Sequence, residues 1–493
     1  MPRSFVPNHS RGIPVLPGKR IGAFGPVPGQ FGNAAGVGVA HPASGFRGGG
    51  RFAPPASMAL RGQIAAPAGF TLALVGFYSA LHTSFAGEIL QVFLHVPFPV
   101  VGIFAVIVPL VVLSTGSVLR FLGIPLALPW MLFNAWVIIC SAVSFYPRGS
   151  ITSVIPFELR LQIIPFLFCA VATTSKGVRR LLSITAIGVL PIIFLCFTEG
   201  QTQAGTRFNI PGTSLENPND LAFHLLWGAA LLLLFLLHKG KLGKLLTLVV
   251  IPASLWFILK TASRSNFLTI FAVVVVGLLL AAPSVRAILL VVVPIGLAIA
   301  LPLLPKATLS RIFAVEVTSS IADVGADAAE TADMQDRRAL GSEEERMQLA
   351  ALAVDATVRH PVFGVGMLMF AGETADFMKK TSGRKAPWLT AHNSYLKISS
   401  ENGVPGLFFY VWSILTAFWM TWRTFQRSRG RPGFEDASRN SVCILLALVV
   451  YAFGTFFCDI VYLPYCAITL GLAAANYLAF RNDDRLATAL ARP

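Results

Sequence analysis

The chain has 493 residues, of which 55% are hydrophobic and only 13% are charged, and its mean hydropathy is +0.69. Soluble domains carry about 25% charged residues, so this composition excludes an ordinary soluble protein and predicts an integral membrane protein. The net charge of +16 has two explanations, nucleic-acid binding or an excess of positive charge in cytoplasmic membrane loops. The basic residues lie in short loops between apolar runs, which favours the second explanation and argues against a nucleic-acid partner.

Residues 1–67 differ from the rest of the chain. They contain ten prolines, thirteen glycines, seven basic residues and no acidic residue. Such a segment buries too little apolar surface to fold, and it lacks the compact pattern of a cleaved signal peptide. We therefore expect residues 1–67 to form a disordered, basic cytoplasmic tail.

The apolar runs that follow predict twelve transmembrane helices, because each run is close to the 17–25 residues that a helix needs to cross a bilayer. Nine fall in residues 68–304 and three in residues 405–480. The predicted fold is an all-α integral membrane protein of about twelve transmembrane helices, since backbone groups in lipid must be satisfied internally. The spans are expected near residues 69–87, 98–114, 124–145, 156–174, 180–198, 219–238, 242–260, 265–282, 285–304, 405–423, 440–458 and 461–480.

The basic residues of the short loops predict the orientation. With twelve spans, every strongly basic connection falls on one side, together with residues 1–67 and the tail at residues 481–493. That side is expected to be the cytoplasm. Residues 305–404, with 13 acidic and 11 basic residues, then form a large loop on the outer side. The basic connections hold Arg120; Lys176, Arg179 and Arg180; Lys239, Lys241 and Lys244; Arg286; and Arg423, Arg427, Arg429 and Arg431.

Parts of the large loop have local signals. Residues 316–342 read as irregular, residues 343–358 as a helix whose acidic first turn suits the helix dipole, and His360–Gly366 as a turn. Asn393–Asn402 predicts a short helix that ends at Gly403, with Pro405 just beyond. Residues 369–390 give no clear signal.

No common metal or nucleotide motif is present. The six cysteines lie in or at the ends of apolar runs without a CxxC pair, so we interpret them as small apolar residues rather than as disulfides or metal ligands. There is no acidic DxD pair to hold a nucleotide sugar through a metal. A soluble nucleotide donor is therefore not favoured.

His392 is the candidate catalytic residue. It lies in a polar run with Asn393, Ser394 and Tyr395, just before an apolar span. A histidine has an unperturbed pKa near neutrality, which suits a general base. The alternative is a purely structural histidine.

Two arginines are candidate ligands for phosphate. Arg207 lies in an outer loop between two spans, and Arg264 lies in TASRSNF at the outer end of another. A guanidinium can hold phosphate oxygens through two parallel hydrogen bonds, and the alternative is snorkelling to lipid headgroups. Asp220 either caps the helix that follows it or orients Arg207. Arg346 is either a substrate ligand or an ordinary charge on a helix face.

These segments together resemble the bacterial O-antigen ligase superfamily, which also contains O-antigen and exopolysaccharide polymerases. The similarity lies in SRS at Ser263–Ser265, HPVFGVG at His360–Gly366, AHNSYLKISSENGVPG at Ala391–Gly406 and RFNIPGTSLENPNDLA at Arg207–Ala222. It covers residues 200–425 closely and the whole chain in the number of spans.

The resemblance implies a glycosyltransferase of the bacterial inner membrane with its large loop in the periplasm. Such an enzyme moves a glycan from an undecaprenyl-diphosphate donor to a hydroxyl acceptor, which is a glycan or lipid A–core. By analogy His392 activates the acceptor hydroxyl, and Arg207 and Arg264 bind the donor diphosphate. Asp220, Arg346 and Asn393 are further candidate substrate ligands, and no metal or cofactor is expected.

Four functions remain open from the sequence. A ligase and a polymerase share the same chemistry and differ in the acceptor, which the sequence does not identify. A transporter of lipid-linked glycans fits the number of spans, but we find no internal repeat and no pair of broken helices of the kind that transporters use. A structural membrane scaffold would leave the outer arginines unexplained.

Overall fold

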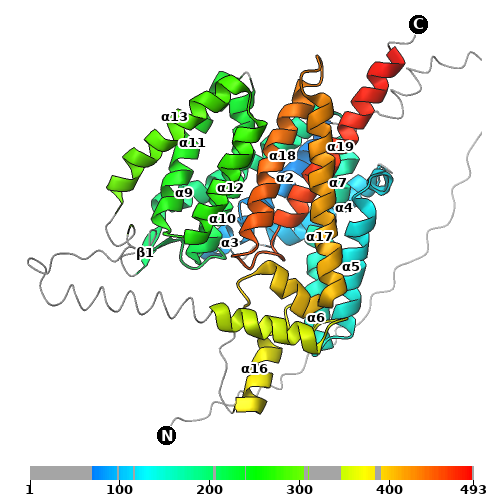
Figure 1. Ribbon diagram of the computed structural model, residues 1–493. Coiled ribbons are helices and arrows are strands. Elements are labelled where there is room, and N and C mark those ends of the chain that lie inside the picture. Colours follow the sequence, from blue (N-terminus) through cyan, green and yellow to red (C-terminus); the bar gives the residue numbers. More distant parts are fainter. Residues whose placement is uncertain are drawn as a thin grey trace, which may run out of the picture. The chain divides into compact units, whose positions relative to one another are not determined.

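In the computed structural model, the described residues are 69–96, 99–114, 117–203, 207–238, 240–304, 309, 346–382 and 390–490. The predictions for residues 1–67 and 316–342, and for the first turn of the helix expected from residue 343, lie outside them. The described chain is almost entirely helical (Figure 1). Its helices in the first half are α2 (Gly69–Thr83), α3 (Ala86–Val92), α4 (Val100–Leu113), η1 (Val118–Gly123), α5 (Ala127–Ala142), α6 (Pro147–Phe157), η2 (Glu158–Gln162), α7 (Ile164–Val171), α8 (Ser175–Ile187), α9 (Leu190–Thr198) and α10 (Pro218–Leu237).

The second half continues the same pattern. Its elements are α11 (Lys241–Lys260), α12 (Arg264–Leu280), α13 (Pro283–Ala300), η3 (Leu301–Leu303), a helix at residues 346–359, α16 (Phe370–Ser382), α17 (Ser394–Ser428), α18 (Glu435–Gly454) and α19 (Tyr465–Leu490). Within the described residues, seven helical segments are long and apolar enough to cross a membrane, and α4, α5 and α12 are shorter apolar helices. Each of the twelve predicted spans overlaps one of the helical segments of the structure.

The all-α prediction misses one small element. Gln201–Gln203 (β1) and Arg207–Asn209 (β2) form an antiparallel hairpin, with Thr202 opposite Phe208. Strands of three residues leave no periodic signal in the sequence. The hairpin bears on the candidate site because β2 begins at Arg207. Backbone pairing of Arg207 with Gln203 therefore fixes the position of this arginine's main chain.

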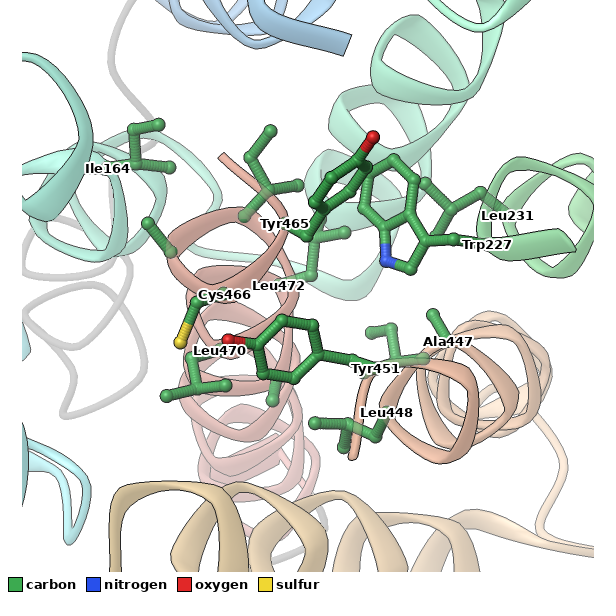
Figure 2. Packing of buried hydrophobic residues seen from close by; sticks show 14 of the residues in the cluster. Ile164, Trp227, Leu231, Ala447, Leu448, Tyr451, Tyr465, Cys466, Leu470 and Leu472 are labelled. Atoms are coloured by element: carbon green, nitrogen blue, oxygen red, sulfur yellow. The ribbon is translucent and has the colours of Figure 1, made fainter. Parts of the chain in front are cut away.

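The bundle packs around α10, α18 and α19. Trp227 of α10, Tyr451 of α18 and Tyr465 of α19 are fully or almost fully buried and lie together in Figure 2. The indole nitrogen of Trp227 also donates a hydrogen bond to the Thr469 hydroxyl at 2.9 Å. By contrast, α13 has no buried residue, as expected for a helix that faces lipid.

The loops rich in basic residues lie at one end of the bundle. Arg179 pairs with Asp436 at 3.0 Å, Arg431 pairs with Asp484 at 2.8 Å, and the Asp483 carboxylate accepts from the backbone of Ser175 at 2.9 Å. The Arg120 guanidinium donates to the carbonyl of Ala170. Segments that the positive-inside rule assigned to the same side are therefore in contact, which agrees with the predicted alternation of the helices.

Candidate functional site

At the opposite end, Asn219 joins three segments of the chain. Its side-chain oxygen accepts from Arg207 at 2.9 Å and from the Ser263 hydroxyl at 2.7 Å. Its backbone carbonyl accepts from the side chain of Asn266 at 3.0 Å and from the Cys458 thiol at 3.8 Å. Asn219 is only 4% exposed. Asn219 thus holds together the loop with Arg207, the start of α12 and the turn between α18 and α19.

Next to Asn219 lies a cluster of charges. Asp220 is half-buried and lies within electrostatic reach of Arg207, Arg346 and Asp459. The helix is capped by Asn217, whose side chain accepts from the backbone of Asn219 at 3.0 Å, so the expectation that Asp220 is the cap is wrong. The structure brings Asp220 together with Arg207 and Arg346, although these residues are far apart in the sequence.

Arg264 begins α12 and is exposed. The residue before it, Ser263, is 1% exposed and is bonded to Asn219. The SRS motif therefore has two structural parts, a buried serine that fixes the helix start and an exposed arginine at the same end of the bundle as Arg207.

His392 is attached to the same network through Ser394. The backbone of Ser394 donates to the carbonyl of Thr455 at 2.9 Å, and its hydroxyl donates to the carbonyl of Cys458 at 2.7 Å. His392 itself is half-buried and has φ = 48°, which a non-glycine residue rarely adopts. Such strained backbone is concentrated at functional sites.

Asn393 is the N-cap of α17. Its side-chain oxygen accepts from the backbone of Tyr395 at 2.9 Å and of Leu396 at 3.1 Å. This cap is a structural use of Asn393 that the sequence analysis did not consider. A contact between Asn393 and substrate stays a prediction.

A buried polar group supports the start of α17. The Lys397 ammonium pairs with Asp459 at 2.7 Å, with the two side chains 8% and 11% exposed. The Tyr462 hydroxyl donates to Glu401 at 2.6 Å and accepts from Asn402 at 3.2 Å. These bonds fix residues 394–402 against the turn that follows α18, and with them the position of His392.

The helix break predicted after Asn402 is confirmed. Gly403 has φ = 67° inside α17, and a Cβ at this position would lie 2.1 Å from the carbonyl oxygen of Val362. The turn predicted at His360–Gly366 is also present, and Val404 donates to the carbonyl of Pro361 at 2.8 Å. The two glycine-containing turns therefore pack directly on each other.

The helix at residues 346–359 confirms the described part of the helix predicted at 343–358. This helix packs against α16, which the sequence did not predict. Arg359 pairs with Glu373 of α16 and with Asp355 at 2.8 Å. Burial alone would lower the pKa of Arg359, but the hydrogen bonds to Glu373 and Asp355 outweigh it and raise that pKa. A small buried apolar cluster that includes Ala353, Ala356 and Phe370 also joins the two helices.

Sequence reasoning missed several residues of the site, above all Asn219, Asp459 and Lys397. Asn219 lies in the polar run Asn217–Asp220, where polar residues before a helix usually act as N-caps. Asp459 could have been found from the sequence, because it is a lone acidic residue between two apolar runs. An unpaired charge at such a position is costly, so it indicates a buried partner or a functional role. Lys397 lies in a polar helical run, where nothing in the local sequence indicates a buried partner.

In a comparison with known families, residues 249–411 match a model described as O-Antigen ligase. The matched segment is about a third of the chain. This finding confirms the resemblance to the superfamily of O-antigen ligases and polymerases. The matched segment contains Arg264, Arg346 and His392, whereas Arg207 and Asp220 precede it and Asp459 follows it. No curated protein matches the chain.

Proposed function

We propose that this protein transfers a glycan from an undecaprenyl-diphosphate donor to a hydroxyl acceptor at the periplasmic face of the bacterial inner membrane. The observation that carries the proposal is the network around Asn219. It holds Arg207 beside Asp220 and Arg346, and it is tied through Cys458 and Ser394 to the segment with His392. The match of residues 249–411 to the O-antigen ligase model supports the class of reaction.

The proposed chemistry needs two functions from the side chains. Guanidinium groups of Arg207 and Arg264 would neutralise the diphosphate leaving group, with Arg346 adding a third positive charge. His392 would take the proton of the acceptor hydroxyl as that oxygen attacks the anomeric carbon. Attack and departure on opposite faces of the sugar give inversion at that carbon. We propose that no metal is needed, since the arginines supply the positive charge.

The identity of the acceptor decides whether the protein is a ligase or a polymerase. A ligase would join polymeric O-antigen to lipid A–core, and a polymerase would extend a lipid-linked repeat. Deleting the gene separates them: loss of capped lipopolysaccharide with accumulation of lipid-linked polymer indicates a ligase, whereas single repeats or missing exopolysaccharide indicate a polymerase.

The catalytic part is tested with His392→Ala and Arg264→Ala in the full chain. We expect His392→Ala to abolish transfer while the protein remains in the membrane, and Arg264→Ala to weaken use of limiting donor. Normal product formation by His392→Ala would show that His392 is not the catalytic base. A protein that moves lipid-linked glycan across reconstituted vesicles without forming a bond would instead be a transporter.

A further inference from the structure

A second feature at the outer end of the bundle is a cavity of about 520 Å³ that lies apart from Arg207 and His392. Its walls are mainly apolar and come from α2, α3, α4, η2 and the turn before α19. The apolar lining includes Phe85, Val100, Val101 and Leu463. One guanidinium, that of Arg160, lines it as well.

Arg160 is unusual for its position. It lies within the candidate span formed by residues 147–171, where a charged side chain is costly unless it is paired or functional. Its side chain is exposed, and within the described part of the chain no ion pair or hydrogen bond engages its guanidinium group. A simple structural ion pair therefore does not explain this arginine.

The backbone around Arg160 is specialised. Glu158–Gln162 forms a π-helical turn, η2, between α6 and α7, and such turns often occur at functional sites. The Arg160 carbonyl accepts from the hydroxyl of Tyr78 at 2.6 Å, and His82 of the same helix α2 lies 3.4 Å from it. Two side chains from a neighbouring helix thus hold the turn that carries the guanidinium.

The other charged group of the cavity already has partners. The Glu88 carboxylate accepts from the backbone nitrogen of Ser214 at 2.8 Å and from its hydroxyl at 2.6 Å. Glu88 is therefore used to hold the outer loop, which leaves the positive charge of Arg160 for a ligand.

We propose that this cavity binds a membrane lipid with a phosphate in its headgroup, the phosphate on Arg160 and the hydrocarbon chain along the apolar wall. A guanidinium matches phosphate oxygens through two hydrogen bonds, and apolar pockets with a few polar groups are typical of lipid and cofactor sites. A water-soluble anion would gain nothing from the apolar lining.

The cavity is connected to the proposed reaction centre on two sides. Ser214, which holds Glu88, lies in the same loop as Arg207, and Tyr462, which lines the cavity, is bonded to Glu401 beside His392's helix. We assign this lipid as the acceptor of the transfer. That assignment rests on the proposed function, whereas the binding site itself does not.

The binding site is tested with the full chain in detergent, by native mass spectrometry. The probes are dioleoyl phosphatidic acid, dioleoylglycerol with the same chains but no phosphate, and inorganic phosphate. We expect the wild-type protein to bind phosphatidic acid at least tenfold more tightly than dioleoylglycerol. Millimolar inorganic phosphate should not displace it; displacement would show a simple anion site and overturn the proposal.

Three variants separate this cavity from the general positive charge of the protein. Arg160→Gln should lose most of the preference for phosphate, whereas Arg148→Gln removes an exposed arginine outside the cavity and should keep it. Gly102→Phe should weaken binding of both lipids, because Gly102 lines the cavity and a Cβ there meets nothing closer than 3.9 Å. Equal losses in Arg160→Gln and Arg148→Gln, or full binding by Gly102→Phe, would refute the site.

The assignment as acceptor is tested by transfer kinetics. Gly102→Phe should raise KM for the acceptor and leave KM for the donor unchanged. A change in donor KM alone would overturn the assignment. If the wild-type protein binds the lipid but forms no glycosidic bond, the proposed function fails and the lipid site remains.

Discussion

The buried ion pair between Lys397 and Asp459 gives a direct test of how the end of the bundle that carries His392 is stabilised. The two charged atoms are 2.7 Å apart and their side chains are 8% and 11% exposed. Replacing one partner leaves the other charge buried and unpaired, which costs about 3–5 kcal/mol. We therefore expect Lys397→Met and Asp459→Leu each to destabilise the protein strongly, by about 6–10 °C in Tm if about 2 °C corresponds to 1 kcal/mol.

The double variant should behave differently. With both charges gone, neither remains buried without a partner, so Lys397→Met/Asp459→Leu should lose less stability than the more damaging single change. The interaction energy in the double-mutant cycle is then large. All six cysteines are buried, so a thiol-reactive dye in detergent reports unfolding.

A matched control is present in α16. Lys380 and Asp376 also pair, at 2.6 Å, but their side chains are 71% and 38% exposed. An exposed pair of this spacing contributes about 0.3–0.5 kcal/mol, so the same cycle should give almost no interaction energy. If the Lys397–Asp459 effects add to within about 0.5 kcal/mol, the two residues are independent and the reasoning is refuted.

Three further predictions follow from other contacts. Gly403→Ala should destabilise the protein by several times as much as Gly430→Ala in thermal unfolding, because both glycines have positive φ but only the first would bring a Cβ onto the Val362 carbonyl; equal losses would mean that backbone conformation alone matters. Asn219→Ala leaves Arg207 and Ser263 without their acceptor, so we expect transfer to fall by about 10–100-fold with a higher donor KM; an unchanged donor KM would show that Arg207 does not bind the donor. Arg359→Gln should speed amide hydrogen exchange in α16 and leave α18 unaffected, since Arg359 pairs with Glu373 and lies 4.0 Å from the ring centroid of Phe377; unchanged exchange in α16 would mean that the apolar cluster alone holds it.

Much of the fold could be predicted because lipid imposes simple rules. Apolar runs of sufficient length predicted where helices occur, and loop charges predicted which connections meet, as Arg179 with Asp436 and Arg431 with Asp484 now show. The break at Gly403 was also readable, because glycine followed by proline two residues later ends a helix. The predicted boundaries were less accurate, since helices such as α17 extend well beyond the apolar run.

The missed features depend on distant partners. Helix α16 has a polar composition and is held by Arg359 and by packing against the helix at residues 346–359, neither of which shows in its own sequence. Asn219 is bonded to residues 44 and 239 positions away. A local reading assigns such a residue to a cap, because caps are the commonest use of asparagine before a helix.

The backbone of His392 is fixed by contacts of the residues before and after it. On one side, Ala391 is 3% exposed and packs in the cluster with Ala353 and Phe370. On the other side, Ser394 is bonded to the turn between α18 and α19. A left-handed conformation at His392 costs about 1–3 kcal/mol and persists only when its surroundings fix it. The apolar cluster on one side and the α18–α19 turn on the other therefore fix the backbone of His392 in a conformation that the local sequence alone would not adopt.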